Sequence, residues 1–394
     1  MATPHFHQLG VKRVTPEAAG ALAILLAVPP DLRDAFAFKP GQFLTLRAQV
    51  NGESVRRSYS ICSSLQRYEM DQEIEVGVKP VAGGVFSNWA VKLQAGDVLD
   101  VMPPEGRFTP RQVTAQRLAT HRVAFCAGSG ITPVLSIIAS TLHAEPASRF
   151  TLVYANQKVS TIMFNEALQD LKDTYPARLT LIHVLSRQAQ DVPLLGGRLD
   201  AARVAELLQV LLPVQFIDEA FVCGPEGMID ATEQALCAAG LPKERIHTER
   251  FFSAGLPATA IPALGSTTSS ANSSENFSEN SNDTINIANY SIRTWANALI
   301  DPPTVLQVVL DGKTHSMAMG SDDKVLDVAL AAGLDLPYAC RGGVCCTCRA
   351  RVLHGKVEMV KNFTLEQWEM DKGFVLTCQA RPLTPEVTVS FDER

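Results

Sequence analysis

The 394-residue sequence predicts a multidomain protein with an all-β barrel, an α/β domain built on a parallel sheet, and a small α+β domain. Three observations predict this order. Between residues 44 and 101 short apolar runs alternate with turn residues, which is typical of an all-β barrel or sandwich. After about residue 118 apolar strands alternate with helical patterns, which indicates a parallel, doubly wound sheet. Residues 304–394 combine a hairpin pattern with one helix.

The predicted barrel covers residues 1–115, and one helix at Phe86–Leu93 interrupts it. Its strands are expected at Leu44–Ala48, Arg57–Cys62, Glu73–Lys79 and Gly96–Met102. An earlier apolar run, Ala18–Val28, follows Lys12 and Arg13 in the manner of a signal peptide. The run has only 11 residues, ends at Pro29 and lacks a convincing cleavage site. We therefore expect it to belong to an early strand pair of the barrel.

The predicted α/β domain covers residues 116–253. Its strands are expected at Val123–Ala127, Thr151–Ala155, Leu179–Leu185 and Ala220–Cys223. Helical patterns lie between them at Val134–Leu142, Phe164–Lys172 and Ala201–Leu211. In a parallel sheet of this kind, ligands are expected beyond the carboxyl ends of the strands.

Residues 254–303 are predicted to be a flexible linker. Its central part, Gly265–Ser291, contains eight serines and six asparagines with few apolar residues, so it cannot offset the entropy of ordering. In the compact unit at 304–394, Asp311-Gly312 connects a hairpin of Val305–Leu310 with Thr314–Met319. A helix is expected at Lys324–Ala332, ended by Gly333.

Charge and cysteine content restrict the function. The net charge is −6 and no basic block is present, so we expect neither nucleic acid nor a membrane as a partner. Four of the nine cysteines crowd between residues 340 and 348. That crowding suits a metal site in a reducing compartment, the cytoplasm, better than a disulfide framework.

The cysteine pattern is the strongest chemical signal. Cys340, Cys345, Cys348 and Cys378 have the C-x4-C-x2-C-x29-C spacing of plant-type [2Fe–2S] ligands. Two glycines after Cys340 would let the backbone pass close to the sulfurs. The alternative is a four-cysteine zinc site, which usually pairs one C-x2-C with another. Cys346 is predicted to be a free thiol.

A second group of residues suits a flavin nucleotide. On a predicted strand, Arg57 could neutralise a pyrophosphate, Tyr59 could stack on an isoalloxazine, and Ser60 could bond a flavin edge. The alternative is an ordinary strand with one exposed arginine and one packed tyrosine. A glycine turn that opens a helix favours the flavin interpretation, because a helix N-terminus suits phosphate. The glycine turn and the start of the helix contribute Gly83, Gly84, Val85, Phe86 and Ser87, and Val78 and Lys79 are also expected to bind a cofactor.

A third group suits a nicotinamide dinucleotide. The turn between a strand and a helix at residues 127–133 matches a phosphate loop, although its G-x-G-x-x-P pattern is also compatible with a plain turn. The residues assigned to it are Gly128, Ser129, Gly130, Thr132 and Pro133. Cys223, Gly224 and Pro225 end a later strand, where Cys223 would border the nicotinamide or be a buried structural cysteine.

The choice between NADPH and NADH is expected to depend on Ser186 and Arg187, which follow the strand Leu179–Leu185. Arg187 offers a fork of donors matched to the 2′-phosphate of NADPH, and no acidic residue appears until Asp191. The alternative is a polar loop after a strand. Phe251 is expected to lie near the flavin.

Taken together, these motifs resemble the ferredoxin–NADP reductase superfamily, and the resemblance covers nearly the whole chain except the linker. It implies an FAD-binding barrel, an NADPH-binding α/β domain and a C-terminal ferredoxin domain of β-grasp-like fold. It also extends to reductase subunits of bacterial oxygenases through Arg56–Cys62, Glu249–Phe251 and Leu336–Cys340. It implies that NADPH is the electron donor and that di-iron oxygenase subunits acting on phenylacetyl-CoA are the acceptor.

Three alternatives stay open at this point. The acceptor could be another oxygenase or a hybrid-cluster protein. The chain could be a free-standing diaphorase that reduces soluble carriers. It could also be a metal-binding interaction module without turnover, although that function has no use for the flavin and dinucleotide motifs.

Overall fold

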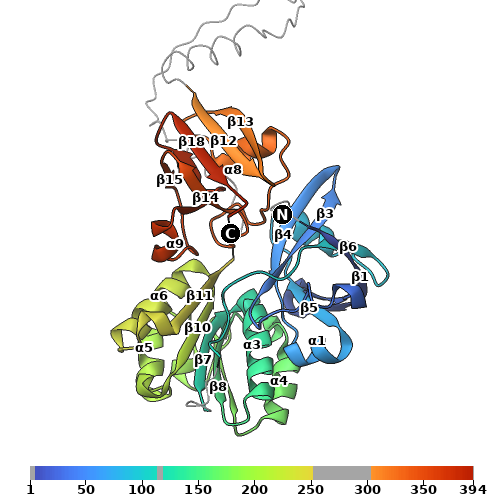
Figure 1. The fold of residues 1–394 in the computed structure, drawn as a ribbon. Coiled ribbons are helices and arrows are strands. Elements are labelled where there is room, and N and C mark those ends of the chain that lie inside the picture. The colour runs from blue at the N-terminus through green and yellow to red at the C-terminus, as the bar shows by residue number, and fades with distance from the viewer. Residues whose placement is uncertain (1–4, 113–118, 252–302, 394) are drawn as a thin grey trace, which may run out of the picture.

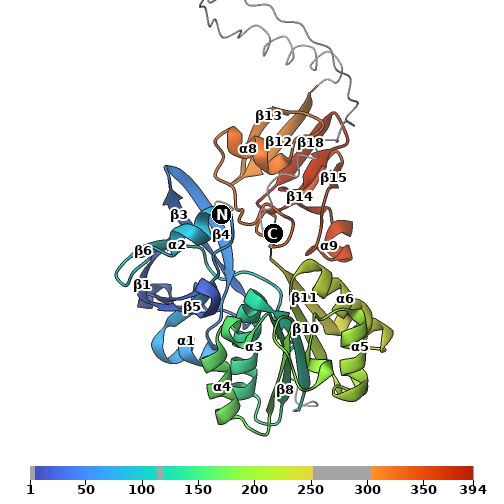
Figure 2. The same ribbon diagram turned by 180° about the vertical axis from the view of Figure 1, so that it is seen from behind.

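The computed structural model describes residues 5–112, 119–251 and 303–393, which form three units that meet at one junction (Figures 1 and 2). The expected linker, 254–303, lies outside the described residues except for Pro303. The expected domain boundaries, near residues 115 and 253, also lie outside them, so they stay predictions.

The N-terminal unit is an antiparallel sheet of six strands in the order β4-β3-β6-β1-β2-β5. The strands are β1 (His7–Pro16), β2 (Leu22–Ala27), β3 (Phe43–Val50), β4 (Glu53–Ser60), β5 (Glu73–Val78) and β6 (Val98–Val101). The sheet curls until its edges meet, where Ile61 bridges to Val76 and the Cys62 N–H donates to the Glu75 carbonyl at 2.8 Å. The predicted all-β barrel is confirmed, and the early apolar run supplies β2.

Two short helices cover the ends of this barrel. Helix α1 (Leu65–Asp71) begins at Ser64, whose hydroxyl accepts the Arg67 N–H at 3.2 Å, and it buries Tyr68. Helix α2 (Val85–Ala90) begins one residue before the predicted position and ends earlier, and it buries Phe86. The barrel core is apolar because alternate residues of the strands, such as Leu44 and Leu46, point inward.

The second unit is a parallel sheet of five strands in the order β11-β10-β7-β8-β9. The strands are β7 (His121–Ala127), β8 (Arg149–Asn156), β9 (Leu179–Leu185), β10 (Glu219–Gly224) and β11 (Ile246–Arg250). The helices are α3 (Ile131–Ala144), α4 (Asn165–Thr174), α5 (Ala201–Val210) and α6 (Glu226–Ala238). They lie on both faces of the sheet, which confirms the doubly wound α/β prediction (Figures 1 and 2).

The C-terminal unit is a mixed sheet in the order β13-β12-β18-β14-β16, with a separate pair β15-β17. The strands are β12 (Thr304–Leu310), β13 (Lys313–Met319), β14 (Arg349–His354), β15 (Val357–Met359), β16 (Phe374–Leu376), β17 (Ala380–Pro382) and β18 (Glu386–Ser390). Helix α8 (Val325–Ala331) packs Leu326 into the core, and α9 (Gln367–Asp371) is short. The sheet is mixed, because β12 pairs with β18 in parallel and with β13 in antiparallel orientation. A mixed sheet with separate short helices confirms the predicted α+β unit.

The C-terminal unit lies over the junction between the barrel and the parallel sheet, with α9 close to α6 and β11 in both views (Figures 1 and 2). This placement brings the cysteine loop close to both other units. Within the described ranges, the helices are too short or too polar for any of them to cross a membrane.

Candidate functional site

The predicted flavin residues of β4 lie beside α2. The Tyr59 ring packs at 5.5 Å from the Phe86 ring, and burial raises the pKa of the Tyr59 hydroxyl. Arg57 donates from Nη1 to the Arg56 carbonyl at 2.7 Å, so its guanidinium is held next to the backbone of β4. The structure therefore brings the strand motif and the glycine-turn motif together, as a flavin nucleotide bound across both would require.

The turn into α2 leaves room for a phosphate. Gly83 has a left-handed φ of 73°, and Gly84 is the N-cap without any side-chain capping bond. A Cβ on Gly84 would lie 2.4 Å from the Ser87 hydroxyl oxygen, so any larger residue here would force the neighbouring side chains to shift. The backbone N–H groups of the first turn thus have no side-chain acceptor and suit an anion. Val85, also in the predicted set, is an exposed residue of this turn.

Val78 ends β5 and Lys79 follows it, on the side of the barrel that faces the parallel sheet. The Val78 side chain is fully buried at the end of β5, so only its backbone can meet a cofactor. The Lys79 ammonium lies 3.9 Å from the position of a Cβ built on Gly128. The lysine therefore adds a positive charge where the flavin and dinucleotide motifs meet.

The predicted dinucleotide loop forms a 3-10 turn at Gly128–Gly130 between β7 and α3. A Cβ on Gly130 would lie 2.2 Å from the Cys223 carbonyl oxygen, so this glycine allows the loop to contact the end of β10. Thr132 donates from its hydroxyl to the Ser129 carbonyl at 3.1 Å, and Pro133 follows in the first turn of α3. Gly224 and Pro225 lie at the same carboxyl edge of the sheet and lead into α6.

The remaining predicted site residues are Cys223, Ser186, Arg187 and Phe251. Cys223 is fully buried between strands, so its contact with a nicotinamide stays a prediction. Ser186 and Arg187 follow β9, two strands away from β7, where the Ser186 hydroxyl donates to the Asn156 carbonyl at 3.3 Å and the Arg187 side chain is exposed. Phe251 is 39% exposed directly after β11. Ligand contacts of these residues also stay predictions.

The four predicted ligand cysteines converge. Hydrogen bonds from Cys345 and then Cys378 lower the pKa of the Cys340 thiol, while hydrogen bonds with Cys340 and then Cys348 raise the pKa of Cys378. The first three cysteines lie in one loop, whereas Cys378 lies in the turn after β16, 30 residues beyond Cys348. Together these contacts place all four thiols around one site.

Backbone and amide donors surround these thiols. The Gly342 N–H donates to Cys340 Sγ at 3.3 Å, and Gln379 donates from Nε2 to Cys378 Sγ at 3.6 Å. Such donors are the ones that stabilise the sulfurs of a bound cluster.

Cys346 occupies a different position in the same loop. It has a left-handed φ of 57°, and its thiol bonds to Thr364 instead of the four ligand cysteines. Burial raises its pKa. The structure therefore separates it from the thiol group, in keeping with the predicted free thiol.

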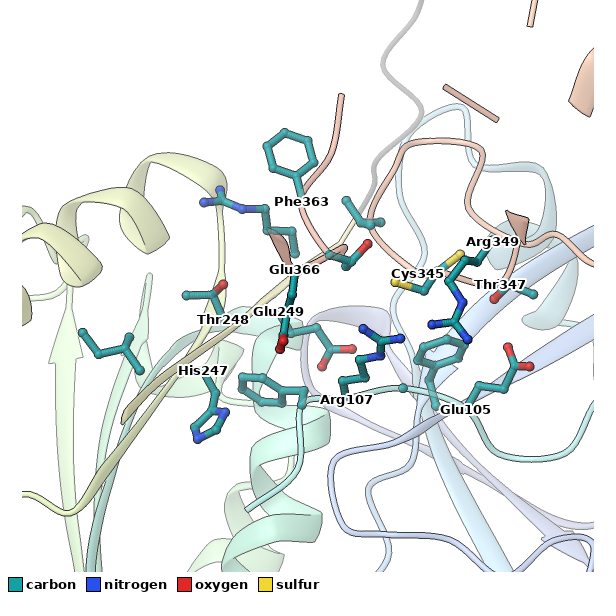
Figure 3. A pocket seen from close by; sticks show the side chains of 18 residues that line it. Glu105, Arg107, His247, Thr248, Glu249, Cys345, Thr347, Arg349, Phe363 and Glu366 are labelled. Atoms are coloured by element: carbon teal, nitrogen blue, oxygen red, sulfur yellow. The ribbon is translucent and has the colours of Figure 1, made fainter. Parts of the chain in front are cut away.

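A cavity of 390 Å³ lies where the three units meet (Figure 3). Phe43 and Arg107 line it from the barrel, His247 and Glu249 from β11, and Cys345 and Phe363 from the C-terminal unit. The end of the flavin strand reaches this junction through Ser60, whose hydroxyl donates to Glu249 Oε1 at 3.5 Å. The cavity therefore connects the flavin strand with the cysteine loop.

Glu249 is a site residue that the motif reasoning did not identify. Its other carboxyl oxygen, Oε2, is shielded and has no hydrogen-bond partner within the described structure. Burial raises the pKa of this carboxyl to about 8, against a small opposing effect of the Ser60 hydroxyl. The stretch Glu249–Phe251 stood out by resemblance, but only the three-dimensional contact with Ser60 assigns the glutamate to the site.

We expect Glu249 to be protonated at neutral pH and to titrate near pH 8. Because its folded pKa is above its usual value, its contribution to stability is present at acid pH and declines as pH rises to about 8. Between the usual pKa of a glutamate and about pH 8, the unfolding free energy should fall by about 1.4 kcal/mol for each pH unit. Infrared titration should show a protonated carboxyl band that is lost near pH 8 and is missing in Glu249→Gln.

Glu366→Gln is the matched control, because Glu366 is an exposed carboxyl that lines the same cavity. This variant should keep the band and its midpoint. A Glu249→Gln protein with an unchanged band would show that another group titrates there.

Comparison with known proteins agrees with this arrangement. Three family models match in order: an oxidoreductase FAD-binding domain at residues 25–109, an oxidoreductase NAD-binding domain at 125–234, and a 2Fe-2S iron-sulfur cluster binding domain at 308–383. The barrel, the parallel sheet and the cysteine-bearing unit thus each correspond to one cofactor. These matches decide for a [2Fe–2S] cluster over zinc.

Relatives match along the whole chain. A component of the 1,2-phenylacetyl-CoA epoxidase from Escherichia coli is 42% identical over 99% of this chain and 98% of its own. The ferredoxin reductase component of 3-ketosteroid-9-alpha-monooxygenase from Rhodococcus rhodochrous is 35% identical over 97% and 96%. The structure of phthalate dioxygenase reductase has the same fold, with a TM-score of 0.55, 18% identity and 98% coverage of both chains. Full-length identity of this level means that the chain belongs to the ferredoxin–NADP-reductase-like family of FAD- and NAD(P)H-binding oxidoreductases that end in a 2Fe-2S ferredoxin domain.

Proposed function

We propose that this protein is the NADPH-dependent reductase component of a di-iron oxygenase that epoxidises phenylacetyl-CoA. The observation that supports this acceptor best is the 42% identity over 391 residues to a component of the Escherichia coli phenylacetyl-CoA epoxidase. The family assignment supplies the coarser function, electron transfer from NAD(P)H through FAD and a [2Fe–2S] cluster to an oxygenase. A cytoplasmic location is part of the proposal, because thiolate cluster ligands suit a reducing compartment.

The chain's own residues bind, orient and bring together the redox groups. Bound FAD would supply the link between a two-electron hydride donor and a cluster that takes one electron at a time. Arg57 and the N-terminal turn of α2 would neutralise the FAD phosphates, and Tyr59 would cover the ring. Lys79 and the Gly128–Gly130 turn would hold the dinucleotide phosphates, and the four cysteines would ligate the two irons.

A different oxygenase is the second candidate acceptor. The 35% identity to the reductase component of a 3-ketosteroid-9-alpha-monooxygenase favours it, because both relatives match the whole chain. Both matches span the FAD-, NAD- and cluster-binding parts of this chain, so a test with the acceptor itself is needed to separate the two candidates. A free-standing diaphorase would reduce soluble carriers without either oxygenase.

Reconstitution tests the proposed acceptor. The holoprotein is mixed with purified phenylacetyl-CoA epoxidase oxygenase subunits, phenylacetyl-CoA and NADPH, and epoxide formation is compared with NADPH consumption. We expect the two to be coupled, and replacement of the oxygenase by that of the 3-ketosteroid system should uncouple them. Coupling with the steroid oxygenase alone would contradict the proposal, and ferricyanide reduction without coupling to either would favour a diaphorase.

A further inference from the structure

A charged contact joins the ferredoxin domain to the flavin-binding barrel. Arg107 of the barrel makes two hydrogen bonds to the Glu369 carboxylate. It donates from Nη1 to Oε2, and from Nη2 to Oε1 at 2.6 Å. Glu369 is the first-turn acid of α9 and is fully buried. Burial would raise the pKa of Glu369, but hydrogen bonds from Arg107, the Glu366 backbone and Arg349 together lower it. The carboxylate is therefore ionised and shared between two domains.

A second charged contact lies near the cysteine loop. Arg56, next to the predicted flavin ligand Arg57, donates from Nη2 to Asp335 Oδ1 at 2.7 Å and from Nη1 to the Leu336 carbonyl at 3.0 Å. Its guanidinium also lies over the Tyr338 ring, 4.6 Å from the centroid. Arg56 is 7% exposed, so the barrel presents a nearly desolvated cation to the segment that leads into Cys340.

An apolar contact lies close to these two. Phe43 of β3 packs with Ala339 and the ligand Cys345 in one buried cluster. On the neighbouring domain, Arg250 of β11 lies over the Phe363 ring at 5.1 Å. The ferredoxin domain therefore rests with its cluster-bearing loop against the flavin-binding barrel, and charge pairs hold it on both sides of that loop.

We propose that Arg56 and Arg107 are positioning residues that dock the ferredoxin domain in the place where its cluster accepts electrons from the flavin. The proposal rests on the family's order of transfer, FAD before the cluster, and on no assumption about the final acceptor. The hydrogen-bond partners of the two arginines are Asp335, Leu336 and Glu369, and none of these is a ligand cysteine. Each acts by fixing the position of a segment of the ferredoxin domain, which sets how close the two redox groups lie.

The contacts imply a reversible, salt-sensitive docking. The Arg107 side chain is 42% exposed and Asp335 is 50% exposed, so mobile ions can screen both pairs. Loss of Arg107 leaves Glu369 paired with Arg349 of its own domain, so the ferredoxin fold does not depend on the contact. Removal of Arg107 should therefore change docking without unfolding the domain.

Stopped-flow absorbance of Arg107→Ala holoprotein, mixed with NADPH without oxygen, tests this directly. The flavin should be reduced at the wild-type rate, whereas reduction of the cluster should be about tenfold slower or more, because a charge-assisted pair biases a two-state equilibrium by roughly that factor. Added salt should slow cluster reduction in the wild type and have little further effect in the variant. Small-angle X-ray scattering should show a more extended variant.

Two other variants make the test specific. Asp335→Ala removes the second contact from the ferredoxin side and should give the same selective loss. Arg351→Ala is the matched control, because Arg351 pairs with Glu393 within the ferredoxin domain and should leave cluster reduction unchanged. Arg107→Lys keeps the charge and should restore part of the rate.

Equal rates of cluster reduction in wild type, Arg107→Ala and Asp335→Ala would overturn the proposal. So would loss of flavin or slower flavin reduction in Arg107→Ala, because the arginine would then act through the flavin site. A failure of electrons to reach the flavin in the wild type would instead contradict the proposed NADPH-dependent function. The two failures are therefore distinguishable.

Discussion

Cys345→Ser should abolish the iron–sulfur cluster, whereas Cys346→Ser should retain it. Cys345 hydrogen-bonds to Cys340 within the group of four thiols, while the Cys346 thiol bonds to Thr364 outside the group. Each of the two irons needs two thiolates, so loss of one ligand leaves an iron incompletely held. Cys340, Cys348 and Cys378 should behave like Cys345. Iron, acid-labile sulfide and the visible spectrum report the result.

Flavin content is the internal control for these variants, because the FAD site lies on a separate domain and should be unaffected. Retention of the cluster in Cys345→Ser together with its loss in Cys346→Ser would contradict the ligand assignment. Loss of both cofactors from every variant would indicate a folding defect in the whole chain.

Arg187→Ala should weaken the use of NADPH and leave turnover with NADH nearly unchanged. The Arg187 side chain is exposed at the carboxyl edge of β9, where a 2′-phosphate would lie, and its backbone N–H donates to the Gln157 carbonyl at 2.8 Å. A charged contact of this type contributes about 1.5–3 kcal/mol. We therefore expect a loss of roughly tenfold to a hundredfold in kcat/KM for NADPH, through a raised KM.

Arg149→Ala is the matched control for charge, because Arg149 is an exposed arginine at the opposite, amino edge of the same sheet. It should change neither coenzyme. Equal losses with NADPH and NADH in Arg187→Ala would point to a folding defect. No loss with either coenzyme would place the phosphate elsewhere.

Local patterns were sufficient for most of the fold. The strand predicted at Leu179–Leu185 has those bounds in β9, and the hairpin around Asp311-Gly312 forms β12 and β13. Both depend on interactions between residues close in sequence, which periodicity and turn chemistry capture. Helix α1 was missed because its short, polar sequence has no strong periodicity, although Ser64 is an N-cap signal.

Sequence patterns could not predict the contacts between residues that lie far apart in the chain. The pairing of Arg107 with Glu369 joins residues 262 positions apart, and that of Ser60 with Glu249 joins residues 189 apart. Each residue looks like an ordinary surface group in sequence, because its partner is supplied only when the three domains pack. The cysteine site was the exception, since its metal chemistry fixes the ligand spacing within the chain.

Stepwise anaerobic addition of NADPH to the holoprotein, followed by visible absorbance, tests the central claim most directly. The claim is that electrons pass from NADPH to FAD and then to the cluster of the same chain. We predict that the oxidised flavin and the oxidised cluster have both lost their absorbance at the end of the titration. When the same protein is mixed rapidly with NADPH, the flavin absorbance should fall first and the cluster absorbance should follow. A cluster that stays oxidised after the flavin is fully reduced, or a protein that binds neither flavin nor iron, would contradict it.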